Sequence, residues 1–294
     1  MRIPRSSSQL GQTLALSRLG NVKWAMSRAE RVATTLLEVA RPSDAPSEWT
    51  SVHRLSAASE DQAVFQRNTE SALTYLDTAD QLLEDGADVL KRAWEIATQM
   101  ANGTHTASSR QAAAVEVDSL RTRMISIANS QVANRHVFAG QAMDQEPFLD
   151  DGTYVGSTEA LDTRIGYLEW IQVGFDGSQV FTGGVDVFAT LSDLSTALNA
   201  NDQVAIRDTL PLIHDGIDQL VRWREEVGFN QNLADDTIEL TRTMKTVLQS
   251  RLAETVQADP AEAYTELANI QTGYQATLQV IGARSSENLF NFIR

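Results

Sequence analysis

The sequence predicts a mainly α-helical protein with a small β-rich insertion, in which the N- and C-terminal halves form a long antiparallel coiled-coil bundle. Apolar residues recur at alternating steps of three and four in nearly every long segment, which is typical of packed helices. Only 6% of the 294 residues are aromatic, and glycine and proline are sparse, so β-sandwiches and barrels are disfavoured.

The two terminal helices have thin apolar seams. The first is expected from about Leu10 to Ala40, and the last from Pro260 almost to Arg294. The larger seam residues are Leu19, Val22, Met26 and Leu36 in the first helix and Leu267, Ile270, Tyr274 and Ile281 in the last. Seams of this kind pair weakly, and isolated helices are marginal in water. We therefore expect the ends to pair with each other and with neighbouring copies, and to become ordered on assembly.

The internal helices carry longer heptad runs, for which the core of an ordinary bundle is the default interpretation. One run spans 65–100 and another spans 113–131. Helix is expected again after Asp186. There, Pro211 predicts a kink or a new start, the run 228–230 an interruption, and 233–255 a further helix.

Helix-breaking and helix-capping residues separate the predicted helices. The breaks are expected at Arg41–Pro46 and at Asn102-Gly103-Thr104, with Ser108 or Ser109 capping the third helix. Asp259 before Pro260 predicts the start of the last helix, because aspartate caps helices and proline suits their first position.

Residues 141–186 predict the insertion. Ile171, Val173 and Phe175 alternate, and Asp176-Gly177 is interpreted as a hairpin turn. The acidic first part of the segment is expected to face solvent. Three domains follow from this interpretation: 1–48 with 257–294 as a terminal coiled coil, 49–140 with 187–256 as a helical middle domain, and 141–186 facing outward.

Charge and composition exclude several classes. The net charge of −15 argues against nucleic-acid binding. Residues 1–42 hold seven basic and two acidic side chains, a net of +5, so the remainder carries −20; a basic end on an acidic body indicates a separate contact surface. There is no cysteine, the N-terminus has no apolar region typical of a cleaved secretory signal, and no stretch approaches the ~18 apolar residues of a membrane span.

The sequence shows no catalytic or metal-binding pattern. None of the four histidines lies three or four residues from another, so no helix-borne metal pair is expected. Neither a phosphate-binding loop nor a nucleophile elbow occurs. We expect no catalytic residue, cofactor or metal, and hence no enzyme.

Four motifs carry a family resemblance. They are Arg41, Pro42, Ser43 and Asp44 after the first helix; Arg92 and Glu95, followed by Asn102 and Gly103, late in the second; Glu116, Val117 and Asp118 in the third; and Arg135, Phe138 and Gly140, followed by Pro147 and Phe148, after it. In this order they resemble the flagellin superfamily. The last motif is similar to the hook–filament junction family within it, hook-associated protein 3.

This resemblance implies a structural subunit of the bacterial flagellum that joins hook to filament. It implies export by the flagellar type III apparatus after a transient cytoplasmic stage, with a cytosolic chaperone covering 260–294. The assembled form would be a ring of about eleven copies between the proximal hook-associated protein and flagellin. In that ring the terminal helices would form an inner tube and the insertion would face outward.

Two other functions stay open at this point. The chain could be a flagellin, the filament subunit itself. From another class, it could be a cytosolic helical scaffold or signalling module. An enzyme hidden in the insertion is a distant third, since no nucleophile, base and orienting group can be assembled there.

Overall fold

The computed structural model describes the backbone of residues 5–293 and the side chains of residues 13–283. Within the described backbone, the helices are α1 (Arg5–Thr35), α2 (Pro46–Met100), α3 (Ala107–Ala128), α4 (Gly177–Thr182), α5 (Val187–Asn199), α6 (Gln203–Val256) and α7 (Pro260–Ile293). The strands are β1 (Gln131–Val132), β2 (Arg135–His136), β3 (Leu161–Arg164) and β4 (Trp170–Gly174). The predicted mainly helical fold with a small strand region is therefore confirmed.

The chain forms two compact units. The terminal unit consists of residues up to Ser59 together with those from Thr246 onward, and the central unit is Glu60–Lys245. The division into three domains stays a prediction, because nothing in the structure tests the separate insertion domain. Each unit is described by itself below.

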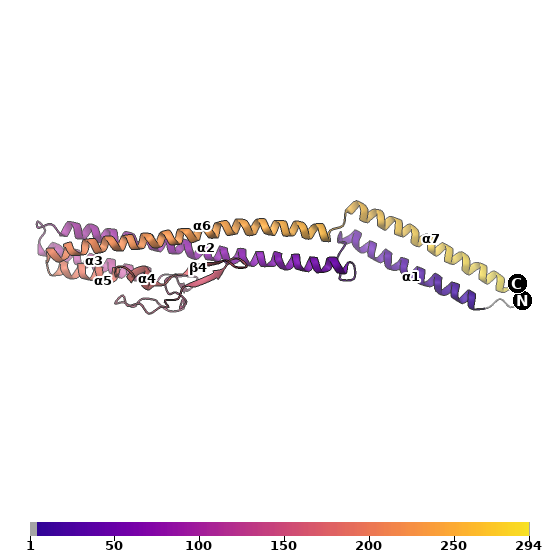
Figure 1. Ribbon diagram of the computed structural model, residues 1–294, viewed down its shortest axis with the longest axis horizontal. Helices are drawn as coiled ribbons and strands as arrows, with labels where there is room; N and C mark the ends of the chain where they lie inside the picture. The colour runs from indigo at the N-terminus through magenta and orange to yellow at the C-terminus, as the bar shows by residue number, and fades with distance from the viewer. Residues whose placement is uncertain (1–4, 294) are drawn as a thin grey trace. The chain divides into compact units, whose positions relative to one another are not determined.

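In the terminal unit, α1 and α7 lie side by side and run in opposite directions (Figure 1). Where α1 ends and α7 begins, Glu38 donates its N–H to the Val256 carbonyl over 2.8 Å, and Ala258 donates to the Leu36 carbonyl over 3.0 Å. Leu36 has φ 54°, a left-handed conformation that stops α1. The first helix therefore ends at Thr35, five residues before the predicted Ala40.

The central unit is built on α2 and α6, which lie side by side, with α3 packed on α5 (Figure 1). The buried heptad residues of α2 include Ala72, Leu76, Ala79, Leu83 and Leu90, as the sequence pattern indicated. Close approach needs small residues: a Cβ on Gly86 would meet Leu220 at 3.2 Å, and one on Gly216 would meet Leu90 at 3.2 Å. Alanine and glycine thus let the helices of this unit approach closely.

Helix α6 is longer than predicted. Pro211 lies inside it and begins no new helix, and the predicted interruption at 228–230 is wrong because the helix continues to Val256. An interior proline costs about 3 kcal/mol and a glycine about 1 kcal/mol. Burial of the same helix outweighs these losses, through residues such as Ile206, Ile213, Leu220, Val227 and Ala234.

The insertion contains two small antiparallel sheets, β1 with β2 and β3 with β4. Asp176-Gly177 is not a hairpin turn: the carboxylate of Asp176 accepts from the Ser178 N–H at 2.9 Å and caps α4. Aspartate before glycine is equally suited to both roles, so local sequence could not decide. Likewise Thr106, rather than Ser108 or Ser109, caps α3. The acidic residues of the insertion's first part are exposed, as predicted: Asp144, Glu146, Asp150, Asp151, Glu159 and Asp162.

Candidate assembly interface

The predicted seam runs between α1 and α7. Ala29, Ala33 and Ala263 are buried where the two helices meet. The eight larger seam residues are all half-buried: Leu19, Val22, Met26, Leu36, Leu267, Ile270, Tyr274 and Ile281. Heptad spacing thus located the contact face of both helices, while the role of these residues in assembly stays a prediction.

Large apolar side chains also lie outside this seam. Leu16 is 61% exposed and Tyr264 is 58% exposed. The other exposed members on these helices are Leu14, Trp24, Leu278 and Val280. Two helices that pack only on each other normally keep polar residues on their outer faces. Apolar residues around the pair indicate that further surface is covered by another molecule.

Two hollows lie between α1 and α7. One, of about 250 Å³, has apolar lining residues that include Ala25, Val32 and Ile270. Its charged lining residues are Arg28, Glu38, Asp259, Glu262 and Glu266. The second, of about 510 Å³, is lined by Leu14, Ala15, Arg18, Val22, Ala276, Thr277, Val280 and Ile281.

The Arg-Pro-Ser-Asp motif forms the turn between α1 and α2. Asp44 Oδ2 accepts from the N–H groups of Ala40, at 3.3 Å, and Arg41, at 2.9 Å. The same carboxylate pairs with Arg31 at 3.4 Å, and its side chain is only 4% exposed. Pro42 and Ser43 are exposed and, with Arg41, supply the turn. Asp44 is therefore the member of the motif that holds the turn together.

The second motif joins α2 to α3. Arg92 donates from Nε to Glu116 at 2.8 Å and from Nη1 to Glu95 at 3.0 Å. Hydrogen bonds to Glu116 and then Glu95 raise the pKa of Arg92, which therefore stays charged. Asn102 and Gly103 lie in the exposed turn after α2. All these groups are exposed, so the ion pairs add little stability.

Sequence reasoning missed Arg110, which organises the same end of the central unit. Its side chain is buried and donates to the carbonyl oxygens of Met100, at 2.9 Å, and Asn102, at 2.7 Å. It also donates to the Asn201 side chain at 2.5 Å. The sequence offered no signal for it, because an arginine in a helical run is most often exposed.

The fourth motif contributes its phenylalanines to an aromatic core. Phe138 and Phe148 are buried and stack edge-on against Phe181 with ring centroids 5.0 and 5.6 Å apart. Pro147 is buried beside them, and Arg135 is exposed in β2. Gly140 has φ 59°, and an added Cβ would collide with the carbonyl oxygens of Ser157 and Glu159. Phe138, Pro147 and Phe148 are thus part of the core of the insertion.

The β3–β4 hairpin is tied to α2 by specific side chains. Tyr167 donates its hydroxyl to Asp61 at 3.0 Å and packs edge-on against Phe65, with ring centroids 5.2 Å apart. The hydrogen bond to Asp61 raises the pKa of Tyr167. Asn68 donates to the Arg164 carbonyl at 2.8 Å. Burial raises the pKa of Tyr154, whose hydroxyl donates to the Ser157 carbonyl at 2.7 Å.

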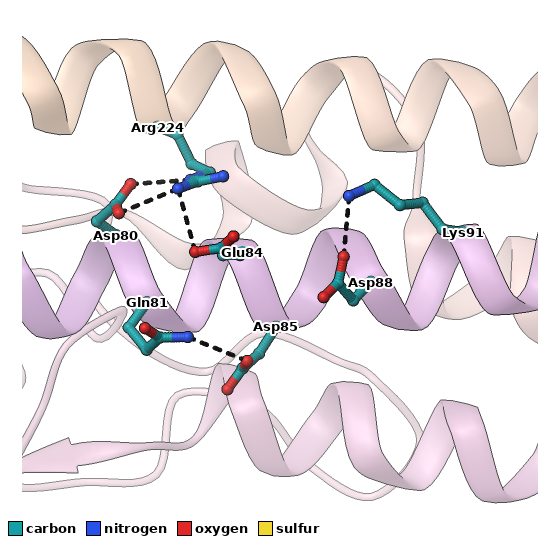
Figure 2. A network of polar contacts seen from close by, with 7 residues as sticks. All are labelled: Asp80, Gln81, Glu84, Asp85, Asp88, Lys91 and Arg224. Carbon is teal, nitrogen blue, oxygen red and sulfur yellow. Dashed lines mark hydrogen bonds and ion pairs between the residues drawn. The ribbon is translucent and has the colours of Figure 1, made fainter.

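Polar pairs join α2 to α6 along the central unit. Figure 2 shows Arg224 pointing from α6 to Asp80 and Glu84 on α2. In the same view, Lys91 contacts Asp88 at 2.9 Å within α2. Further along the helices, Gln231 donates to Asp77 at 2.9 Å. Acidic residues thus lie mainly on α2 and their partners mainly on α6.

Gln219 is a second buried polar residue that sequence reasoning missed. Its Oε1 accepts from the N–H groups of Gly184, at 3.0 Å, and Val185, at 2.9 Å. Its Nε2 donates to the Val180 carbonyl at 2.8 Å. One side chain therefore satisfies the backbone between α4 and α5.

No described residues form a group of three or more His, Asp or Glu side chains placed to hold a metal ion. Among the described helices, none is long and apolar enough to cross a membrane.

The fold thus defines a mainly α-helical protein with paired terminal helices and a small inserted strand region. Residues 7–143 match the family model of the bacterial flagellin N-terminal helical region. The flagellar hook-associated protein 3 of Escherichia coli (strain K12) is 25% identical over 145 residues, 49% of this chain and 46% of the relative. That of Salmonella typhimurium (strain LT2) is 23% identical over 179 residues, 60% and 56% of the two chains.

Among solved structures, a flagellar hook-associated protein from Vibrio parahaemolyticus has a TM-score of 0.67 at 20% identity, covering 73% of this chain and 100% of that one. The chain spans about half the length of the curated relatives that it matches. Residues 7–143 of the chain are thus similar to the helical N-terminal region of bacterial flagellins.

Proposed function

We propose that this chain is a structural subunit of the bacterial flagellum and acts as an adaptor that joins the hook to the filament. Three findings support the proposal: the flagellin family match over residues 7–143, relatives named hook-associated protein 3, and the paired terminal helices. The work of such an adaptor is mechanical, since it holds two different polymers together and transmits torque between them.

The observation that carries the proposal is the apolar surface of the α1–α7 pair. Among the described side chains of the two helices, those buried in the seam are alanines, whereas Leu16, Trp24 and Tyr264 are exposed. Burial of an apolar side chain of this size yields about 2 kcal/mol. Neighbouring copies that cover these residues would therefore stabilise both helices, as assembly into a tube requires.

The proposed partners follow the same logic. The chain would contact other copies of itself in a ring of about eleven, the proximal hook-associated protein on one side and flagellin on the other. Before export by the type III apparatus, a cytosolic chaperone would cover α7, whose exposed apolar residues include Tyr264, Leu278 and Val280. The mature location would be the hook–filament junction outside the cell.

Deletion of the gene tests this function. Cells should keep their hooks, lose their filaments and release flagellin into the medium, and the full chain should restore swimming. Cells that keep their filaments and swim without the chain would contradict the junction role. A chain found only in the cytosol of motile cells would favour a helical scaffold or signalling module.

Flagellin is the second candidate, because the matching family model describes the helical region of flagellins. The two functions differ in how far the purified subunit extends a filament. A purified filament subunit should extend long filaments from a seed of flagellar fragments, whereas a junction subunit should add a limited layer and stop. Electron microscopy of seeds incubated with the full chain distinguishes these outcomes by the length added.

A further inference from the structure

The α1–α7 pair has two opposite flanks. Successive residues of an α-helix are rotated by about 100°, so residues two apart point to nearly opposite sides. Leu14 lines a hollow between the helices, and Leu16 therefore points away from it. On α7, Tyr264 lies two residues from both Glu262 and Glu266. These two glutamates line the hollow of about 250 Å³, which we call the acidic hollow.

The same relationship holds further along α7, where Val280 lines a hollow and Leu278 lies two residues before it. The two sides of the pair are called the hollow flank and the lysine flank. The hollow flank comprises Leu14, Trp24, Val280 and the acidic hollow. The lysine flank comprises Leu16, Lys23, Tyr264 and Leu278. Within residues 13–283, where side chains are described, each flank exposes large apolar side chains, so the pair is apolar on both sides.

The acidic hollow on the hollow flank is suited to a cation. Four carboxylates and one guanidinium line it, which leaves an excess of three negative charges. Aliphatic side chains, among them Val32 and Ile270, and Trp24 also line it. An ammonium group on a four-carbon stem matches this surface, because the stem packs on apolar side chains while the charge meets carboxylates. An indole ring nearby adds a cation–π contribution.

Lys23 is a suitable cation on the opposite flank. It is exposed, and it lies nine residues from both Leu14 and Val32, which line the two hollows. Nine residues are about two and a half helical turns, so Lys23 points away from its own chain's hollows. Residues 1–42 carry a net charge of +5 on a chain whose remainder carries −20, which favours contacts between unlike parts of two copies.

We propose that Lys23 of one copy enters the acidic hollow of the next copy, so that the lysine flank of each terminal pair docks on the hollow flank of its neighbour. Because the two flanks differ, the contact is head to tail and repeats from copy to copy into a ring or an open helix. The inference rests on the proposed assembly function and adds to it the residues and the direction of the contact between copies.

Engineered disulfides test the contact, since the chain has no cysteine of its own. The full chain carrying K23C and E266C is concentrated until it sediments as an assembly and is then oxidised. The proposal expects a ladder of covalent dimers, trimers and higher oligomers. The matched control is K23C with Q275C, because Gln275 is exposed and lies nine residues, about two and a half turns, from Glu266.

The outcomes separate the inference from the proposed function. A ladder with K23C/E266C and not with the control supports the contact. Dimers alone, an equal ladder in the control, or an assembly without cross-links overturn the contact and leave the assembly function standing. If the full chain without substitutions fails to assemble at any concentration and its gene is dispensable for filaments, the proposed function and the inference fall together.

Charge reversal gives an independent measurement. K23E and E266K should each raise the concentration at which half of the chain sediments by about tenfold, as the loss of an interfacial ion pair does. The double variant K23E/E266K should return toward the original concentration, whereas K23E/Q275K should not. Equal behaviour of the two double variants would overturn the proposal. Circular dichroism of each variant confirms that its helices are intact.

Discussion

Arg224 of α6 makes a two-point contact with Asp80 of α2, residues that lie 144 positions apart in sequence. Its Nε donates to Oδ1 over 2.8 Å and its Nη2 to Oδ2 over 3.1 Å, while Glu84 accepts from Nη2 at 3.3 Å. The hydrogen bond to Asp80 raises the pKa of the guanidinium, which stays charged. Five carboxylates lie on this stretch of α2, at Asp77, Asp80, Glu84, Asp85 and Asp88. Arg224 reduces their mutual repulsion at the contact with α6.

Replacing Arg224 by methionine should lower the free energy of unfolding by about 1 kcal/mol, since the side chain is 32% exposed and solvent screens the pair. R224K should recover only part of the loss, because an ammonium group lacks the planar fork. Urea unfolding at low and high salt measures both effects. R222M, at an exposed arginine two residues away, is the control, and an equal loss there would contradict the assignment.

The helical part of the fold could be predicted because its signal is periodic. The heptad spacing located the buried residues of α2 and the seam of α1 and α7. The signal failed at Gly228, where an interruption was predicted and the helix continues, and at Pro211 no new helix begins. Local preference costs about 1 to 3 kcal/mol at each, and burial elsewhere along α6 exceeds it. That burial depends on contacts with α2, which the local sequence of α6 cannot show.

Replacing Gly228 by alanine should raise the free energy of unfolding by about 0.5–1 kcal/mol. Gly228 lies within α6, and a Cβ there meets nothing within 4 Å, so alanine adds helix propensity without a clash. Thermal unfolding followed by circular dichroism measures the gain. A loss of stability would show that the helix is interrupted at this position after all.

Replacing Gly140 by alanine should instead lower the free energy of unfolding, by about 3 kcal/mol or more. The backbone has φ 59°, which costs alanine about 1–2 kcal/mol, and the Cβ would lie 2.6 Å from the Glu159 carbonyl oxygen. Near-UV circular dichroism, which reports aromatic packing, should change as well. The comparison with G228A under the same conditions controls for the general effect of a Gly to Ala change.

The insertion and the buried polar residues could be predicted only in outline. The motif residues Phe138 and Phe148 were recognised, yet their place in an aromatic core depends on contacts with Phe181 and Phe188 from another part of the chain. Gln219 satisfies backbone groups of α4 and of the loop before α5, and nothing in its neighbours distinguishes it from an exposed glutamine. Hydrogen bonds of this kind depend on tertiary structure, so the sequence alone does not reveal them.

Replacing Asp44 by alanine should lower the stability of the turn between α1 and α2 by about 1–2 kcal/mol. The substitution removes a buried acceptor for the N–H groups of Ala40 and Arg41 and the partner of Arg31. Hydrogen exchange at the amides of Ala40 and Arg41 should accelerate accordingly. S43A is the matched control, because Ser43 is exposed in the same turn. Unchanged exchange in D44A would mean that the backbone alone holds the turn.

Removing residues 260–294 separates folding of the central unit from assembly. Its core is formed by 60–245, so the truncated chain should keep that unit's helical signal and thermal transition. It should remain monomeric at concentrations where the full chain sediments, because α1 loses the partner of its alanine seam and is marginal alone. Analytical ultracentrifugation of both chains measures this difference. A truncated chain that assembles normally, or restores swimming to cells lacking the gene, would show that pairing of the terminal helices is dispensable.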